Sequence, residues 1–190
     1  MNADTMATEI ISAMSDVDFT ATDSSGVLIN GADAALETLA DVVKSHIETN
    51  SAWEFSWAGV LQGSPDPTVS FTGSIVFTSF VLKPYVDANP TDDKIEDGDV
   101  AMDDLASQLA TQIAGGIITP ADGWTMTMPL ILSPLAVKGS LSTSGYDSQS
   151  SAMVDFCSKI IECVKATINN TSWAGTHNGY VGPAVMLSIS

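Results

Sequence analysis

A fourteen-residue pattern occurs twice in this chain and limits its fold more than any other feature. SWAGVLQGSPDPTV begins at Ser56, SWAGTHNGYVGPAV begins at Ser172, and seven of the fourteen aligned positions are identical. Each copy follows an amphipathic stretch, VVKSHIETN from Val42 and CVKATINNT from Cys163. Repetition of this kind favours a duplicated unit, here a helix, a turn, the SWAG strand, a glycine turn and a proline-led strand. The alternative is a coincidence of turn chemistry.

Hydrophobic periodicity predicts the remaining elements. Apolar residues recur at helical spacing in 3–14, 33–49, 101–118 and 152–168, and alternation predicts strands in 53–62, 69–77, 125–132 and 185–189. At Ser79 the apolar phase flips so that Phe80 and Leu82 form the buried set, which indicates a bulge or a change of partner. The sequence therefore predicts an α+β fold with amphipathic helices packed on an antiparallel sheet and an internally duplicated helix–strand–strand unit.

The length of 190 residues suits a single domain, residues 1–190. A subdivision into halves 1–90 and 91–190 stays open, because an acidic, proline-containing connection at 83–99 separates two similar stretches. The least charged region, 105–137, is interrupted by glycine and proline, so we expect no membrane-spanning helix there. The acidic start of the chain is also unlike a signal peptide.

The charge balance argues against nucleic-acid and membrane partners. The chain has 23 acidic residues, six lysines and no arginine, for a net charge of -17. Such a charge repels phosphate backbones and anionic lipids, and without arginine the usual bidentate contact to phosphate or guanine is missing. The lysines are scattered along the sequence and form no basic patch.

Aromatic and sulfur-containing residues of the repeat region have structural and functional interpretations. Trp57 and Trp173 open the two SWAG strands, and we interpret them as core residues, with a sugar-binding or partner-binding face as the alternative. Cys157 and Cys163 lie six residues apart in a helical stretch, on different faces of the helix. We therefore expect two buried thiols that do not bond to each other.

No residue set predicts catalysis or cofactor binding. His46 lies on a helix flank, where we expect a surface or boundary position, and His177 lies in the glycine turn of the second repeat. The first repeat has Leu61 at the position of His177, so a general base there has no counterpart. No nucleophile elbow, P-loop or dinucleotide-binding glycine pattern occurs. We therefore predict no catalytic residues, no cofactor and no enzyme.

The acidic stretch from Asp93 to Asp104 partly matches a calcium-binding loop. It has acids at the first, fifth and seventh places and glycine at the sixth, but Ile95 stands at the third place and Asp104 replaces the usual glutamate. The other interpretation is that these acids begin a helix, where its exposed amides favour negative charge. A weak cation site stays open, and no metal ligands are assigned.

Short amphipathic helices followed by glycine-rich and Ser/Thr-rich strands, as in GVLINGADAALETLADVVKSHIETN and HNGYVGPAVMLSIS, resemble structural proteins of tailed-bacteriophage particles. The resemblance implies a non-enzymatic assembly protein of the neck, tail, baseplate or capsid decoration. It also implies a virion location, and partners that are copies of itself and neighbouring particle proteins. The alternative function is a small acidic binding domain that is calcium-assisted or carbohydrate-directed.

Overall fold

A computed structural model describes most of the chain in nine stretches. These are residues 1–17, 31–51, 53–57, 71–86, 94–120, 125–126, 147–169, 173–177 and 180–189. Side chains are described in 1–17, 31, 33–51, 75–86, 100–117 and 147–166. The residues that decide what the helices pack against belong to this second set.

Four helices form the larger part of the structure. They are α1 (Ala3–Ser15), α2 (Gly31–Asn50), α3 (Lys94–Ala114) and α4 (Gln149–Asn169). In α1 the Asn2 side chain accepts a hydrogen bond from the amide of Thr5 at 3.0 Å. At the start of α4, the side-chain oxygen of Ser148 accepts a hydrogen bond from the Ser151 amide, and that of Ser151 accepts one from the Ser148 amide. These side chains satisfy amides that the first turn of a helix leaves without an intrahelical partner.

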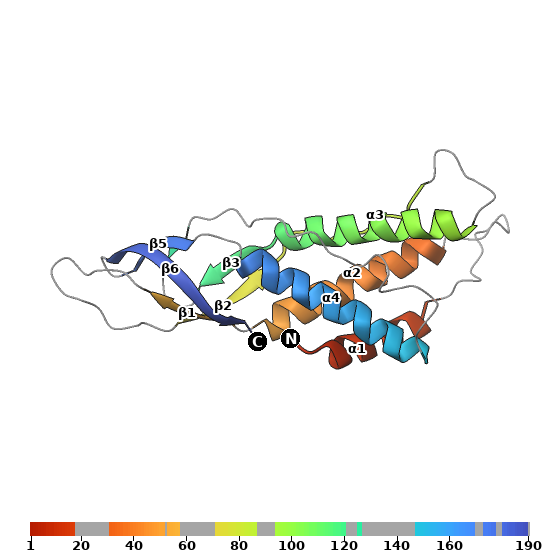
Figure 1. The fold of residues 1–190 in the computed structure, drawn as a ribbon, viewed down its shortest axis with the longest axis horizontal. Helices are drawn as coiled ribbons and strands as arrows, with labels where there is room; N and C mark the ends of the chain where they lie inside the picture. The colour runs from red at the N-terminus through yellow and green to blue at the C-terminus, as the bar shows by residue number, and fades with distance from the viewer. Residues whose placement is uncertain are drawn as a thin grey trace.

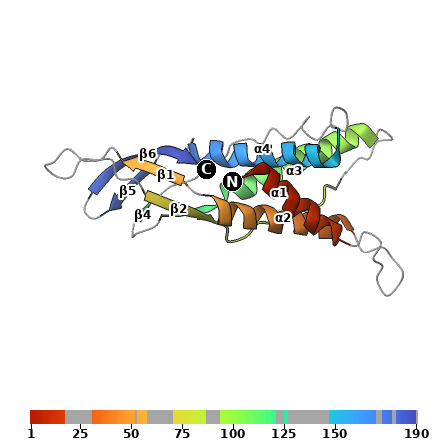
Figure 2. The same ribbon diagram turned by 90° about the horizontal axis from the view of Figure 1, so that it is seen from below.

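Six strands continue from one end of the helices. They are β1 (Trp53–Trp57), β2 (Phe71–Val76), β3 (Ile117–Pro120), β4 (Thr125–Met126), β5 (Trp173–His177) and β6 (Tyr180–Ile189). Neighbouring strands are antiparallel, in the order β3-β2-β1-β6-β5-β4. Figure 1 and Figure 2 show the strands at one end of an elongated molecule and the four helices at the other.

The core lies between the helices. Each helix buries apolar residues at helical spacing: Met6, Ala7 and Ile10 in α1, Leu39, Ala40, Val43 and Ile47 in α2, Ala106, Leu109, Ala110 and Ile113 in α3, and Phe156, Cys157, Ile160, Ile161, Cys163 and Val164 in α4. Helix α1 contacts both α2 and α4, and α4 also contacts α3. The apolar stripes therefore face one another, as in a helix bundle.

The predicted α+β class, with amphipathic helices packed on an antiparallel sheet, is wrong. Of the residues whose side chains are described, 75% are helical, and strand among them amounts to one short stretch. The strands extend the molecule beyond the helices and do not lie beneath them (Figure 1). Periodicity correctly predicted the four helices, but it carries no information about what covers their apolar faces.

The repeated sequence has the same order of elements in both copies without the same packing. One copy contains α2, β1 and β2, and the other contains α4, β5 and β6. Trp57 of β1 and Trp173 of β5 both pair with Ala184, from opposite sides of β6. However, α2 contacts α1 and β2, whereas α4 contacts α1 and α3. The duplicated unit of the predicted fold class is therefore not reproduced as a packing unit.

The predicted phase change at Ser79 is confirmed. Ile75 and Phe77 are buried before it, Phe80 and Leu82 are buried after it, and Ser79 itself is exposed. The rings of Phe77 and Phe80 meet edge to face with centroids 5.1 Å apart. The chain leaves β2 at Val76 and continues without a strand partner as an extended segment, Phe77–Val86, beside the helices.

The third helix begins earlier than predicted. It starts at Lys94 and not at residue 101, and it ends at Ala114, directly before Gly115 and Gly116. The last six residues of the expected connection at 83–99 are therefore helical, while its first residues, 83–86, belong to the extended segment. Residues 87–93, between these two parts, lie outside the described residues.

Candidate functional site

A buried histidine on α2 forms the clearest polar contact between two helices. Its Nδ1 lies 2.8 Å from Oε2 of Glu9 on α1, and the His46 side chain is 1% exposed. An ionised carboxylate only accepts hydrogen bonds, so the geometry assigns a proton to Nδ1. The Nε2 atom is buried and has no hydrogen-bond partner. The predicted surface or boundary position of His46 is therefore wrong.

The carboxylate of Glu9 also acts on a buried thiol of α4. Cys157 on α4 is fully buried, and burial together with the negative charge of Glu9 raises the pKa of its thiol to about 12. A thiol with such a pKa is almost entirely protonated near neutral pH, and a protonated thiol is a poor nucleophile. Cys163 is also buried, and neither cysteine forms a disulfide, as predicted.

A shallow cavity of about 370 Å³ lies over the contact between α1 and α2. It is lined by Glu9, Asp41, Val42, Ser45, His46, Thr49 and Asn50. The amino group of Met1 donates a hydrogen bond to the backbone oxygen of Asn50 at 3.1 Å, and burial together with Lys165 lowers its pKa. These contacts hold α1 against the end of α2.

The stretch that partly matches a calcium loop is helical. Residues 94–104 all belong to α3, and a calcium loop of this kind requires a sharp, non-helical turn at its glycine. Asp97 lies in the first turn of α3, whereas Asp103 and Asp104 lie two turns further on. In the part of the chain with described side chains, no three metal-ligating residues are grouped to hold an ion.

Gln108 of α3 holds the extended segment Phe77–Val86 by hydrogen bonds to its backbone. Oε1 of Gln108 accepts a hydrogen bond from the Lys83 amide at 2.8 Å, and Nε2 of Gln108 donates one to the Lys83 carbonyl at 3.0 Å. The same Nε2 donates to Asp104 at 2.6 Å. Gln108 thus satisfies both backbone groups of Lys83, as a neighbouring strand would. Glu48 of α2 holds the start of the segment by accepting the amide of Phe77 at 2.7 Å.

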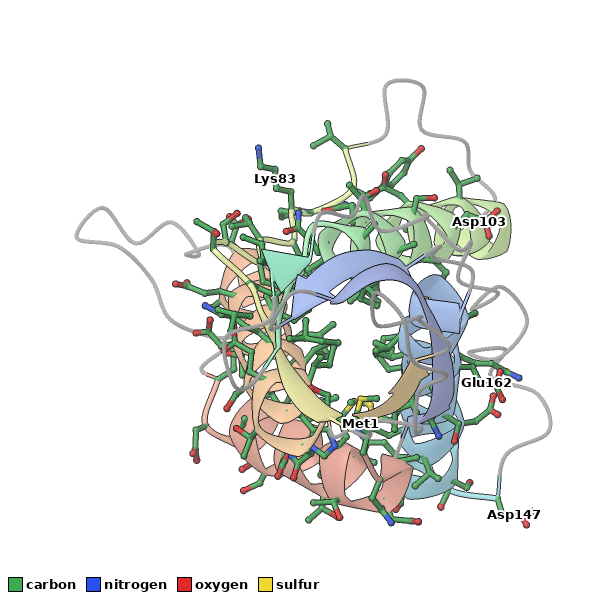
Figure 3. All side chains as sticks on the ribbon, turned by 90° about the vertical axis from the view of Figure 1, so that its left-hand side faces the viewer. Met1, Lys83, Asp103, Asp147 and Glu162 are labelled. Atoms are coloured by element: carbon green, nitrogen blue, oxygen red, sulfur yellow. The ribbon has the colours of Figure 1, made fainter. Side chains whose placement is uncertain are left out.

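Two hollows flank this segment. One of about 780 Å³ extends along α3 and is lined by Val81, Lys83, Pro84, Tyr85, Val86, Asp104, Gln108 and Gln112. The other, of about 320 Å³, extends along α2 and is lined by Asp33, Glu37, Ala40, Asp41, Phe80, Val81 and Leu82. Val81 lines both, and we call the two neighbouring hollows together the α2–α3 groove. In Figure 3, Lys83 points outward on this side of the molecule, between α2 and α3.

Large apolar side chains are exposed mainly at two places. Val81, Tyr85 and Val86 lie on the extended segment, and Val86 is 83% exposed. Val76 and Ile117 are paired in register on β2 and β3 and are 46% and 56% exposed. Among the described residues the remaining exposed large apolar side chain is Val100 on α3. Two gatherings of this kind are candidates for contact with other protein.

Several residues singled out in the sequence have undescribed side chains. Trp57 and Trp173 lie in β1 and β5, and His177 ends β5 opposite Tyr180, but only their backbone positions are described. The choice between a core and a binding role for the two tryptophans therefore lies outside the described residues.

The sequence analysis did not predict the burial of His46 or the hydrogen bonds of Gln108. His46 lies seven residues after Leu39 and three after Val43, so its spacing within the apolar stripe of α2 could have shown its burial. Nothing in the sequence marks Gln108, because its partner Lys83 is 25 residues away and the bonds are to the backbone.

Comparisons with family models, curated proteins and solved structures found no match. No described helix is long and apolar enough to cross a membrane.

Proposed function

We propose that this chain is a non-enzymatic structural protein of a tailed-phage particle that acts through protein–protein contacts. It would be a component of the neck, tail, baseplate or capsid decoration and would associate with its own copies and with neighbouring particle proteins. The particle assignment rests on the resemblance of the sequence to such proteins. The proposed action through protein–protein contacts is supported by the exposed apolar side chains.

The observation that carries the proposal is the gathering of exposed apolar side chains on backbone that is held in place. Val76 and Ile117 stand side by side on paired strands, and β3 is the outermost of the described strands. An outermost strand presents unpaired backbone groups, and a β-branched pair beside it adds apolar surface. This combination suits association of one copy with another.

Electrostatics sets the conditions for such association. Copies that each carry a net charge of -17 repel one another, and added salt screens this repulsion. An apolar contact without opposing charges should therefore strengthen as the salt concentration rises.

Sedimentation equilibrium tests this proposal. We expect the protein to form a defined oligomer, and its dissociation constant should fall as salt is raised from about 0.05 M to about 0.5 M. The double variant Val76→Ser/Ile117→Ser should weaken association by about tenfold or more, because both apolar side chains leave the contact. Val100→Ser, which removes an exposed valine elsewhere, is the matched control. A monomer under all these conditions would contradict the proposed self-association.

A further inference from the structure

We propose that the α2–α3 groove binds a short, extended segment of a different protein in which basic and apolar residues alternate. This inference rests on the proposed function, since it names the chemistry of one neighbouring partner. Three observations lead to it: the row of carboxylates on α2, the apolar side chains on the extended segment, and the composition of the chain itself.

Carboxylates follow the α2 side of the groove in a single row. Asp33, Glu37 and Asp41 are spaced four residues apart, so they lie on one face of the helix, about 6 Å apart along its axis. All three are exposed, and within the described residues none of them is in an ion pair. The α3 side adds Asp104, and the cation described in the groove is Lys83. The groove therefore favours a cationic occupant.

The spacing of this row matches an extended peptide. Alternate side chains of a strand lie about 6.6 to 6.8 Å apart on one face, close to the step between the three carboxylates. The intervening side chains of such a peptide point to the opposite side. That side would meet Val81, which is 52% exposed and lines both hollows. Beyond Val81 it would meet Tyr85 and Val86, which are 37% and 83% exposed and line the hollow along α3. Basic side chains would thus contact α2 while apolar ones cover the extended segment.

A second copy of this chain is poorly suited to be the occupant. The sequence has no arginine, and its six lysines are scattered, with no two of them at alternate positions. A copy seated in the groove would bring further carboxylates toward the row on α2, which is unfavourable. Nucleic acid and anionic lipid are repelled for the same reason. The complement of the groove is a basic segment of another protein.

The backbone of the groove is already in place for binding. Gln108 holds Lys83 by two hydrogen bonds, and the buried side chains of Phe80 and Leu82 anchor the segment in the core. Binding of a partner therefore causes little further loss of conformational entropy in this surface, which favours affinity.

Fluorescence anisotropy with labelled hexapeptides tests the inference on the intact protein. The probe is a peptide of alternating arginine and valine, and the control peptide has the same composition, with three arginines followed by three valines. We expect the alternating peptide to bind at least about tenfold more tightly than the control, because only it can place its charges and apolar groups on opposite faces. Failure of the alternating peptide to bind at about 1 mM, or equal binding of the two, overturns the inference.

Matched variants separate the groove from net charge. The triple variant Asp33→Asn/Glu37→Gln/Asp41→Asn should weaken binding of the alternating peptide by about tenfold or more at about 0.15 M salt. The control triple Asp16→Asn/Asp147→Asn/Glu162→Gln changes the net charge equally with exposed residues outside the groove and should have less than about a threefold effect. Asp147 and Glu162 lie away from Lys83 in Figure 3. Equal weakening by both triples would overturn the inference.

A single substitution tests the groove independently, in case the triple variant fails to fold. Val81→Lys places a cation on an exposed position between the two hollows and should abolish peptide binding, whereas Ser150→Lys at the exposed start of α4 should not. Sedimentation of the groove triple then distinguishes the occupants: if the oligomer dissociates, a second copy fills the groove and the inference is wrong. A chain that binds the peptide but never self-associates would instead contradict the proposed function alone.

Discussion

The contact between His46 and Glu9 is the most consequential single pair of side chains in the helix core. The imidazole is buried, and Glu9, whose side chain is 44% exposed, reaches it from the edge of the bundle. One nitrogen of the ring is satisfied and the other is not. The pair therefore fixes α1 on α2 at the cost of one unsatisfied buried atom.

Removing the Glu9 carboxylate alone should lower the free energy of unfolding more than replacing both Glu9 and His46. Glu9→Ala leaves the Nδ1–H of His46 buried without an acceptor, and we expect it to lower the free energy of unfolding by about 1 to 3 kcal/mol. The double variant Glu9→Ala/His46→Leu replaces the ring by an apolar side chain and should recover most of this loss. Urea denaturation measures both. If the double variant is less stable than Glu9→Ala alone, the ring is needed for more than this one hydrogen bond.

The environment of Cys157 predicts an unreactive thiol. Burial and the nearby charge of Glu9 raise its pKa from 9.0 to about 12, so the fraction of thiolate at a given pH below 9 falls about a thousandfold. A raised pKa also means that the folded state loses stability as pH rises from 9.0 toward 12. Labelling with a thiol reagent at about pH 8 should be slow in the native protein and fast in urea. Rapid native labelling of Cys157 would show that it is accessible.

The end of α3 depends on close contact between a glycine and β2. A Cβ atom at Gly116 would lie 2.8 Å from Cε1 of Phe77 and 2.9 Å from Cγ2 of Ile75, both in the core. At Gly115 the nearest atom is the Gln112 carbonyl oxygen at 3.3 Å. The two glycines, adjacent in sequence, therefore differ in the space available to a side chain.

Gly116→Ala should lower the free energy of unfolding by about 1 to 3 kcal/mol, because the added methyl group must displace two buried side chains. Gly115→Ala is the matched control and should cost less than about 1 kcal/mol. Thermal or urea unfolding of the two variants makes the comparison. Equal effects would mean that the strand and the helix end do not meet as described.

The helices and the extended segment illustrate how far sequence reasoning reached. The stripe of α2 and the phase change at Ser79 were readable because each depends on a local period. The packing of α1 on α2 and α4, in place of a sheet, depends on contacts between distant residues, and no period encodes those. The Gln108 bonds to Lys83 and the groove beside them arise only once α3 and the segment meet. The candidate site was therefore not predictable, although the acidity that gives it its character was.

The whole molecule combines a helix core, a strand extension and two exposed apolar gatherings under a strong negative charge. The paired Val76 and Ile117 suit contact between copies, and the α2–α3 groove suits a basic partner. The first surface lies on β2 and β3, and the second lies along the segment that follows β2, between α2 and α3. In the proposed function, these two kinds of contact join copies of the chain to one another and to a different protein.

Quantitative mass spectrometry of purified particles tests the proposed role most directly. Particles released from the host that carries this gene would be banded on a density gradient, washed at high salt, and their proteins counted against an internal standard. We expect the chain in a fixed number of copies per particle, and its cross-links to a neighbouring protein should involve residues beside the α2–α3 groove. Absence of the chain from washed particles would contradict the proposed function.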